Sequence, residues 1–455
     1  LPILTRPSVG QLLGLAWPVV ISRSAQVVVG ITDGVMCARL GEDALAATNT
    51  GATNAFGVLV LFMGTSFIVS SFASQLVGAR DYAGARRFGY YGLILAGLAA
   101  IMGLVAVPLV GPAISLLDFS PHVRALIVGY LQMRLLSCGF AAGIEALSNY
   151  YGGLGNTRLP MAAQIIAMVL NVLFCWMFIF GNLGAPDLGV PGSGLAATLA
   201  SAAAFVFLGA CFFFGVGHEK AALAQPVKLN AREFGRMLRF GLPVGLNWFV
   251  EFGAFWLFIN IIMAGLGTTA LAAVSAVFQL TSISFMPSFA IASAGSIFVG
   301  QAIGANKHDD VPRTVKLTLA TAATWQGLAG ITCLVVPGAL LSVFVKDASA
   351  QQAFIEAGVR FLMISAAWQL FDAVSMVFAE ALRAAGDTSF TFWARAFLAW
   401  LVFAPGAWIT ARVAKLDALY VVAWLVVYLV MLAVVLVLRF RTNKWRTMQL
   451  TEPTL

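Results

Sequence analysis

The chain has 455 residues, of which 60% are hydrophobic and 10% are charged. Soluble globular proteins carry about 25% charged residues, so a water-soluble fold of this length would lack polar surface. The net charge of +8 does not indicate nucleic acid, because the basic residues lie in short loops between apolar runs rather than on one face. We therefore expect an all-α integral membrane protein with no nucleic-acid partner.

Twelve apolar runs are long enough to cross a bilayer, which takes about 20 residues. Short polar segments such as Gly41-Glu42-Asp43 and Gly386-Asp387-Thr388 separate these runs and are typical of turns. The expected spans are residues 12–38, 50–76, 89–110, 125–152, 159–182, 192–215, 240–264, 271–302, 314–343, 355–384, 389–411 and 416–439.

Loop charge predicts the orientation of these spans. If the first residue lies in the cytoplasm, the cytoplasmic loops and termini hold 18 of the 27 lysines and arginines. The positive-inside rule then places both termini in the cytoplasm, with the chain in the cytoplasmic (inner) membrane. Attraction of these basic loops to anionic lipid also accounts for the net positive charge.

The chain contains two copies of one unit. Trp17-Pro18-Val19 is echoed by Leu242-Pro243-Val244, and Gly155-Asn156-Thr157 by Gly386-Asp387-Thr388, at offsets of 225 to 231 residues. Each copy has an even number of spans, so the second enters the membrane in the same direction as the first. We expect two six-helix lobes that enclose a central cleft and rock to expose it to either side. The expected parts are an N-terminal lobe at 1–215, a cytoplasmic linker at 216–240 and a C-terminal lobe at 241–455.

Three acidic residues inside the spans are candidate functional groups: Asp33, Glu251 and Asp372. A charge near the bilayer centre costs about 2.5–3.5 kcal/mol on insertion scales, so each needs a reason. A residue that the fold requires should occur in both copies, whereas each of these acids occurs in only one. We therefore predict that they bind a cation.

Other charged residues in the spans have structural interpretations. We expect partners on other helices for Arg134 and Glu145. Arg360 and Arg395 lie near helix ends, so both can extend their guanidinium groups to water.

Polar side chains could support the three acids. Hard oxygen ligands suit Na⁺, whereas a carboxylate alone suits H⁺. We therefore expect Na⁺ or H⁺ at Glu251 and Asp372, and leave open whether Asp33 binds the coupling ion, the substrate or neither. The candidate supporting or substrate-contacting residues are Asn247, Gln279, Trp368 and Gln369 in the second copy and Asn171 and Thr198 in the first.

The sequence resembles the multidrug and toxic compound extrusion (MATE) transporters along its whole length, and most closely their NorM-like branch. The resemblance is carried by Asp33-Gly34, the Gly152–Thr157 turn, the stretch from Pro243 to Glu251, and Phe371-Asp372-Ala373-Val374. It implies export of cationic or amphipathic compounds coupled to Na⁺ or H⁺. Glu251 and Asp372 match the branch's cation-site acids, and Asp33 matches the acid of the first span.

Two positions depart from the pattern of the branch. Trp368 stands where a tyrosine is usual, so one oxygen ligand is missing. Cys175 stands one turn after Asn171, where some relatives have an acid. Both departures argue against a fully Na⁺-type site, especially in the first lobe.

The functional hypothesis is secondary active efflux, in which an inward-moving cation and an exported organic cation compete for the same acids. We expect small organic cations and membrane lipid as partners, no cofactor besides the coupling ion, and a monomer. The chain shows no catalytic motif, so we do not expect an enzyme. A carrier of the major facilitator type and a lipid-linked oligosaccharide flippase are the alternatives. The flippase would need arginines such as Arg23 and Arg134 to face its anionic cargo.

Overall fold

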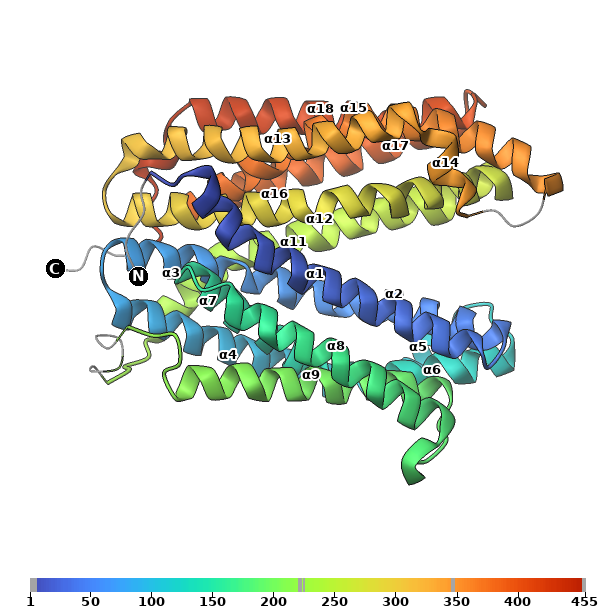
Figure 1. The fold of residues 1–455 in the computed structure, drawn as a ribbon, viewed down its shortest axis with the longest axis horizontal. Helices are drawn as coiled ribbons and strands as arrows, with labels where there is room; N and C mark the ends of the chain where they lie inside the picture. Colours follow the sequence, from blue (N-terminus) through green and yellow to red (C-terminus); the bar gives the residue numbers. More distant parts are fainter. Residues whose placement is uncertain (1–5, 220–222, 224–225, 345–347, 452–455) are drawn as a thin grey trace. The chain divides into compact units, whose positions relative to one another are not determined.

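The computed structural model describes residues 6–219, 223, 226–344 and 348–451, and these residues form helices and loops without strands (Figure 1). In lipid every backbone polar group must be paired within the protein, which an α-helix achieves inside a single segment. The all-α expectation is therefore confirmed. The helices of the first half are α1 (Val9–Ala38), α2 (Glu42–Ser66), α3 (Ile68–Gly78), α4 (Tyr82–Ala106), α5 (Val110–Ser115), α6 (Pro121–Leu135), α7 (Cys138–Gly153), α8 (Arg158–Phe180) and α9 (Val190–Phe213).

The second half includes two stretches of π-helix, η3 and η6, each directly continuous with an α-helix. The elements of this half are α11 (Ala231–Leu257), η3 (Phe258–Met263), α12 (Thr268–Gly304), α13 (Val311–Val335), α14 (Pro337–Ser342), α15 (Ala348–Ala385), α16 (Thr388–Phe397), η6 (Leu398–Phe403), α17 (Ala404–Arg412) and α18 (Ala418–Arg441).

The helices are long and apolar enough to cross a membrane. Within the described residues, eleven continuous helical segments meet this condition, and α6 with α7 forms a twelfth that is bent by 46°. At this bend Arg134 Nη1 donates to Ser137 Oγ at 2.6 Å, and that hydroxyl donates to the Arg134 carbonyl at 2.7 Å. A side chain that bonds to the helix backbone in this way is a known cause of kinks. The twelve expected spans are thus accounted for, the fourth as a broken helix.

The helices group into two packing units. Among the described residues, the N-terminal unit comprises Pro18–Gly245, and the C-terminal unit comprises residues 6–17 and those from Leu246 onward. The units therefore end within α1 and α11, next to the repeat-related Pro18 and Pro243. The division into lobes at residues 215 and 241 stays a prediction.

Small residues bring helices close together inside each unit. In the N-terminal unit α4 packs on α7, and a Cβ added to Gly92 would lie 2.8 Å from Cβ of Ala146. In the C-terminal unit α12 packs on α13, where a Cβ added to Gly295 would lie 2.4 Å from Oγ1 of Thr318. Close backbone approach of this kind is how membrane helices gain packing without a hydrophobic driving force.

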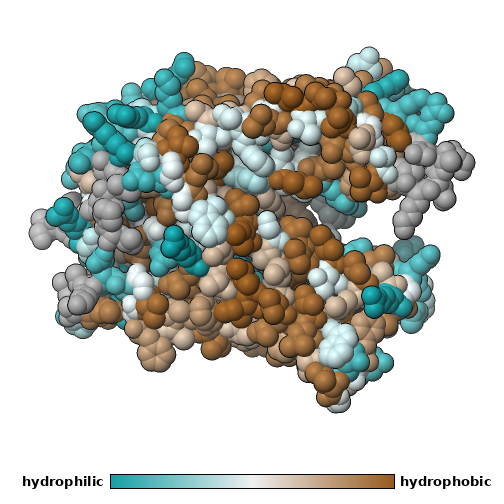
Figure 2. Space-filling model, viewed as in Figure 1, coloured by the Kyte–Doolittle hydropathy of each residue, from teal (hydrophilic) through white to brown (hydrophobic). Residues whose placement is uncertain are grey.

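Apolar side chains cover the middle of the helices, whereas polar ones gather near their ends (Figure 2). Ile101 and Leu104 on α4 are about as exposed as loop residues, at 60% and 59%, as expected for side chains that face lipid. At the helix ends arginines pair with acids. Arg87 pairs with Glu233 at 3.1 Å in the N-terminal unit, and Arg439 pairs with Asp387 at 2.6 Å in the C-terminal unit.

Candidate functional site

The C-terminal unit contains an ion pair between two helices that are far apart in sequence. Glu251 lies two turns before the end of α11, and Arg395 lies near the end of α16; its Nη1 donates to Glu251 Oε2. The two side chains are 19% and 15% exposed, so the pair is mostly enclosed but not sealed. Both helices continue into π-helical turns, which occur frequently at functional sites.

Asp372 completes this centre from α15. Its side chain is half-buried and lies within electrostatic range of both Glu251 and Arg395. Tyr428 of α18, which is 1% exposed, lies within range of the same charges. Two carboxylates therefore face one guanidinium, which leaves one net negative charge when both acids are ionised.

This geometry corrects one sequence-based interpretation. We expected Arg395 to extend its guanidinium group to water, but the side chain turns inward and pairs with Glu251. The sequence position of Arg395 could have predicted this pairing. Arg395 lies seven residues after the start of α16, and a guanidinium that far inside a span is stabilised more by a nearby acid than by extending to water.

Aromatic rings pack on the elements that carry this centre. Trp400, in the π-helical turn η6, donates from Nε1 to the Val250 carbonyl at 3.0 Å and packs on Gly253, where an added Cβ would lie 3.3 Å from the indole ring. The other ring contacts here join Phe258 to Phe403 (centroids 5.1 Å), Phe403 to Tyr428 (5.5 Å) and Phe278 to Trp368 (6.0 Å, stacked). Phe258, Phe403 and Tyr428 are buried in this packing, whereas Trp400 is 41% exposed, so its ring beside the net negative charge suits an amphipathic cation.

The supporting residues that the sequence suggested for Glu251 and Asp372 have different environments. Asn247 lies one turn before Glu251, and its Oδ1 is enclosed without a hydrogen-bond partner among the described residues. Gln369 is 2% exposed and points elsewhere: its Oε1 accepts from Ser284 Oγ at 3.1 Å. Trp368 is buried against Phe278, whereas Gln279 is exposed.

The N-terminal unit holds a smaller acidic site around Asp33 of α1. Asp33 is 7% exposed, and the Cys175 thiol of α8 donates to its Oδ1 at a Sγ–Oδ1 distance of 3.1 Å. Asn171, one turn earlier on α8, is 1% exposed. Thr198 gives its hydroxyl hydrogen to the Met133 carbonyl at 2.8 Å rather than to Asp33. The structure thus places Asn171, but not the Thr198 hydrogen, at this acid.

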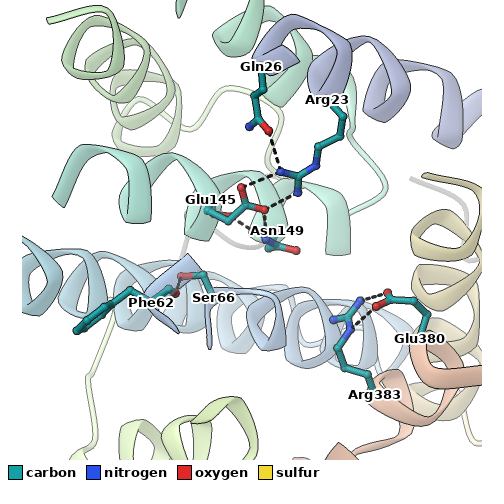
Figure 3. Close-up of polar contacts among 8 residues, drawn as sticks. All are labelled: Arg23, Gln26, Phe62, Ser66, Glu145, Asn149, Glu380 and Arg383. Atoms are coloured by element: carbon teal, nitrogen blue, oxygen red, sulfur yellow. Dashed lines mark hydrogen bonds and ion pairs between the residues drawn. The ribbon is translucent and has the colours of Figure 1, made fainter. Parts of the chain in front are cut away.

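A second ionic group in the N-terminal unit is fully paired. Arg23 of α1 forms a bidentate pair with Glu145 of α7, at 2.7 Å and 3.3 Å (Figure 3). Arg23 also donates to Gln26 Oε1 at 3.2 Å, and Asn149 donates to Glu145 Oε1 at 3.2 Å. Glu145 therefore has the partner on another helix that the sequence predicted. Arg134 instead bonds to the neighbouring Ser137.

Figure 3 also shows a pair in the C-terminal unit, in which Arg383 contacts Glu380 one turn earlier on α15. Arg383 further donates to Ser296 Oγ of α12 at 3.2 Å. The charge of Glu380 is therefore balanced within the protein by Arg383.

Comparison with known proteins agrees with the division of the sequence into two copies of one unit. The MatE family model matches residues 18–177 and again 243–409, once in each copy of the repeat. The chain is 31% identical over 396 residues to the probable multidrug resistance protein NorM of Mesorhizobium japonicum, covering 85% of the chain and 83% of that protein. It is 27% identical over 408 residues to the multidrug resistance protein PmpM of Pseudomonas aeruginosa, covering 88% and 83%.

Solved structures share the fold. An outward-facing conformation of a multidrug resistance MATE family transporter of the MOP superfamily superimposes with a TM-score of 0.84 at 19% identity, over 95% of both chains. A crystal structure of MATE in complex with MaL6 gives a TM-score of 0.85, also at 19% identity and 95% coverage. The family match covers most of both halves, and it excludes the major facilitator alternative. The chain belongs to the MatE family, and its curated relatives are of the NorM type.

Proposed function

We propose that this chain is a secondary active multidrug efflux transporter that exports cationic or amphipathic organic compounds in exchange for Na⁺ or H⁺. Membership of the MatE family and the names of its NorM and PmpM relatives support multidrug efflux. The proposal includes residence in the cytoplasmic membrane, with both termini in the cytoplasm, and action as a monomer.

The observation that carries the coupling proposal is the imbalance of charge at Glu251, Asp372 and Arg395. A single guanidinium cannot neutralise two carboxylates, and these side chains lie in segments that cross the membrane, where uncompensated charge is costly. A cation that supplies the missing positive charge stabilises the centre. H⁺ stabilises the centre by neutralising one carboxylate. Na⁺ stabilises it by binding to the carboxylate oxygens and also to enclosed oxygens such as Asn247 Oδ1.

Exchange follows if an organic cation competes for the same negative charge. The indole ring of Trp400, which is 41% exposed and bonds to the Val250 carbonyl next to Glu251, offers a face to an organic cation with a flat apolar body. The site then holds either the coupling cation or the exported cation, and each one displaces the other. Mutual exclusion of two ligands is the thermodynamic condition for antiport.

The test is transport of a fluorescent organic cation into inside-out vesicles under an imposed Na⁺ or pH gradient. The variants Glu251→Gln and Asp372→Asn should each lose gradient-driven transport while still inserting in the membrane. Glu356→Gln is the matched control, because Glu356 is an exposed acid on the same helix as Asp372. Full transport by the double variant Glu251→Gln/Asp372→Asn would refute the proposal.

The flippase alternative finds less support. An anionic cargo needs arginines that are free to bind it, but Arg23 is bidentate to Glu145 and Arg134 donates to Ser137 Oγ at 2.6 Å. Uptake of a fluorescent anionic lipid analogue by the same vesicles separates the alternatives. The flippase predicts movement of the anionic lipid, and our proposal predicts movement of the organic cation.

A further inference from the structure

The Asp33 site differs chemically from the centre at Glu251. Asp33 is the single carboxylate in a buried group of side chains from α1, α8 and α9, in which Cys175 and Asn171 are 0% and 1% exposed. The Cys175 sulfur lies 3.1 Å from Asp33 Oδ1 and 3.8 Å from Asn171 Oδ1. Because Cys175 is one turn after Asn171 on α8, both side chains reach Asp33 from the same helix face.

Two buried polar atoms at this site are poorly paired. Asn171 Nδ2 and Ser193 Oγ are enclosed and make no hydrogen bond of normal length to a described residue, although Asn171 lies within interaction range of Asp33. Ser193 is 0% exposed, and its hydroxyl lies near the Cys175 thiol. Poorly paired polar atoms in such a place indicate a small polar guest, such as a water molecule that can carry a proton to the acid.

We propose that Cys175 determines the coupling ion of the N-terminal unit, because its thiol, which donates to Asp33, makes this a site that binds H⁺ and excludes Na⁺. The inference rests on the proposed function, since it concerns which cation drives the exchange. Na⁺ needs several oxygen ligands, and a thiol is a soft, weak ligand that presents its hydrogen to Asp33. The Arg134 guanidinium lies within electrostatic range of Asp33 and opposes a second full positive charge nearby.

A proton has none of these requirements. It binds to one carboxylate oxygen, needs no coordination shell, and leaves Asp33 neutral in a place where burial disfavours charge. The thiol hydrogen bond stabilises the ionised form and so keeps the proton exchangeable. Cys175 thus acts through Asp33 as a positioning residue and excludes Na⁺ without contacting the exported compound.

The first test measures binding of radioactive Na⁺ to purified protein in which Glu251→Gln and Asp372→Asn silence the other centre. This protein should bind no Na⁺ at millimolar concentrations. Adding Cys175→Asp, which supplies a second carboxylate beside Asp33, should create Na⁺ binding that a further Asp33→Asn change abolishes. Asp33-dependent Na⁺ binding by protein that retains Cys175 would overturn the proposal.

The second test follows protonation of Asp33 by infrared spectroscopy, with the carboxyl band identified by its loss in Asp33→Asn. Cys175→Ala removes the donor and should raise the proton affinity of Asp33 by roughly three- to tenfold, given the modest strength of a thiol hydrogen bond. Cys175→Ser restores a donor and should return the affinity to within about twofold of the parent. Cys211→Ala, a buried cysteine of α9, is the control and should cause no shift.

Equal proton affinities in the parent and Cys175→Ala proteins would also refute the role of Cys175. Both readouts use purified protein without any organic cation. A failure of drug transport would therefore leave the ion-selectivity result standing, and a failure here would leave efflux through the Glu251 centre intact.

Discussion

The two packing units each contain an ion pair on the helix where the repeat begins, but the two pairs differ in balance. In the N-terminal unit Arg23 of α1 and Glu145 balance each other, and Gln26 and Asn149 satisfy their remaining hydrogen bonds. In the C-terminal unit the acid is on the first helix, at Glu251 of α11. Its arginine must also offset Asp372, so one negative charge is left over.

On the proposed function, this difference separates a structural ion pair from a functional one. A balanced, hydrogen-bonded pair holds two helices together and has no unbalanced charge with which to bind a ligand. An unbalanced group of the same residue types attracts a cation and responds when that cation leaves. The two copies of one unit thus carry their ion pairs at different positions and with a different balance of charge.

Neutralising each pair as a whole is the strongest test of the comparison. Arg23→Gln with Glu145→Gln should retain most efflux, because replacing a buried pair by neutral partners is often nearly neutral for stability. Arg395→Gln with Glu251→Gln should reduce efflux to the level of vesicles without the protein, because the charge at the exchange centre is gone. Vesicle transport of a fluorescent cation measures both. Equal loss from the two double variants would abolish the distinction.

Breaking only one partner should reveal the structural role of Arg23. Arg23→Gln leaves Glu145 charged and 4% exposed, so unfolding should become easier by about 3 kcal/mol. Thermal unfolding in detergent measures this, and the double variant with Glu145→Gln should recover most of the loss. Arg395→Gln should cost less in the presence of the coupling cation, which can replace the guanidinium. A loss that is independent of the cation would contradict the exchange role.

A smaller effect should follow from Trp400→Phe, which tests how the Glu251 helix is held. The change removes a second hydrogen bond to the Val250 carbonyl, beyond the one within α11, and its loss should destabilise the protein by about 1 kcal/mol. Trp393→Phe is the matched control, because Trp393 lies on the adjoining helix α16 and is 67% exposed. If the two variants unfold alike, the indole bond does not support the site.

The smallest expected effect lies outside the membrane spans, in the segment after α9 of the N-terminal unit. His218 packs against Tyr150 and Phe212, each at a ring-centroid distance of 5.5 Å. Burial lowers the pKa of His218, and the positive charge of Arg86 lowers it further. The unfolded chain therefore binds the proton more readily, so the protein should lose stability as the pH falls from about 7.5 to about 5.5.

The variant His218→Phe should show a weaker loss of stability over the same pH range. Unfolding midpoints measured at both pH values for the two proteins provide the comparison. An identical pH dependence would show that the folded protein does not lower the pKa of His218, contrary to the burial of its ring.

The sequence was sufficient for the fold, because in lipid the length of an apolar run and the pairing of its backbone nearly dictate a helix. It also singled out Glu251, Asp372 and Asp33, because a charge inside a span is costly and each acid occurs in one copy only. The bend between α6 and α7 was not foreseen, since it depends on bonds between Arg134 and Ser137.

What the tertiary structure alone decided is which charges meet. The residues of the Glu251–Arg395 pair are 144 positions apart, and those of the Arg23–Glu145 pair are 122 apart. Hydropathy places a side chain at a depth in the membrane but not toward a particular neighbour. The direction of a side chain follows from helix rotation and packing. The cost of a charge inside a span therefore identified the charged residues but could not distinguish balanced pairs from unbalanced ones.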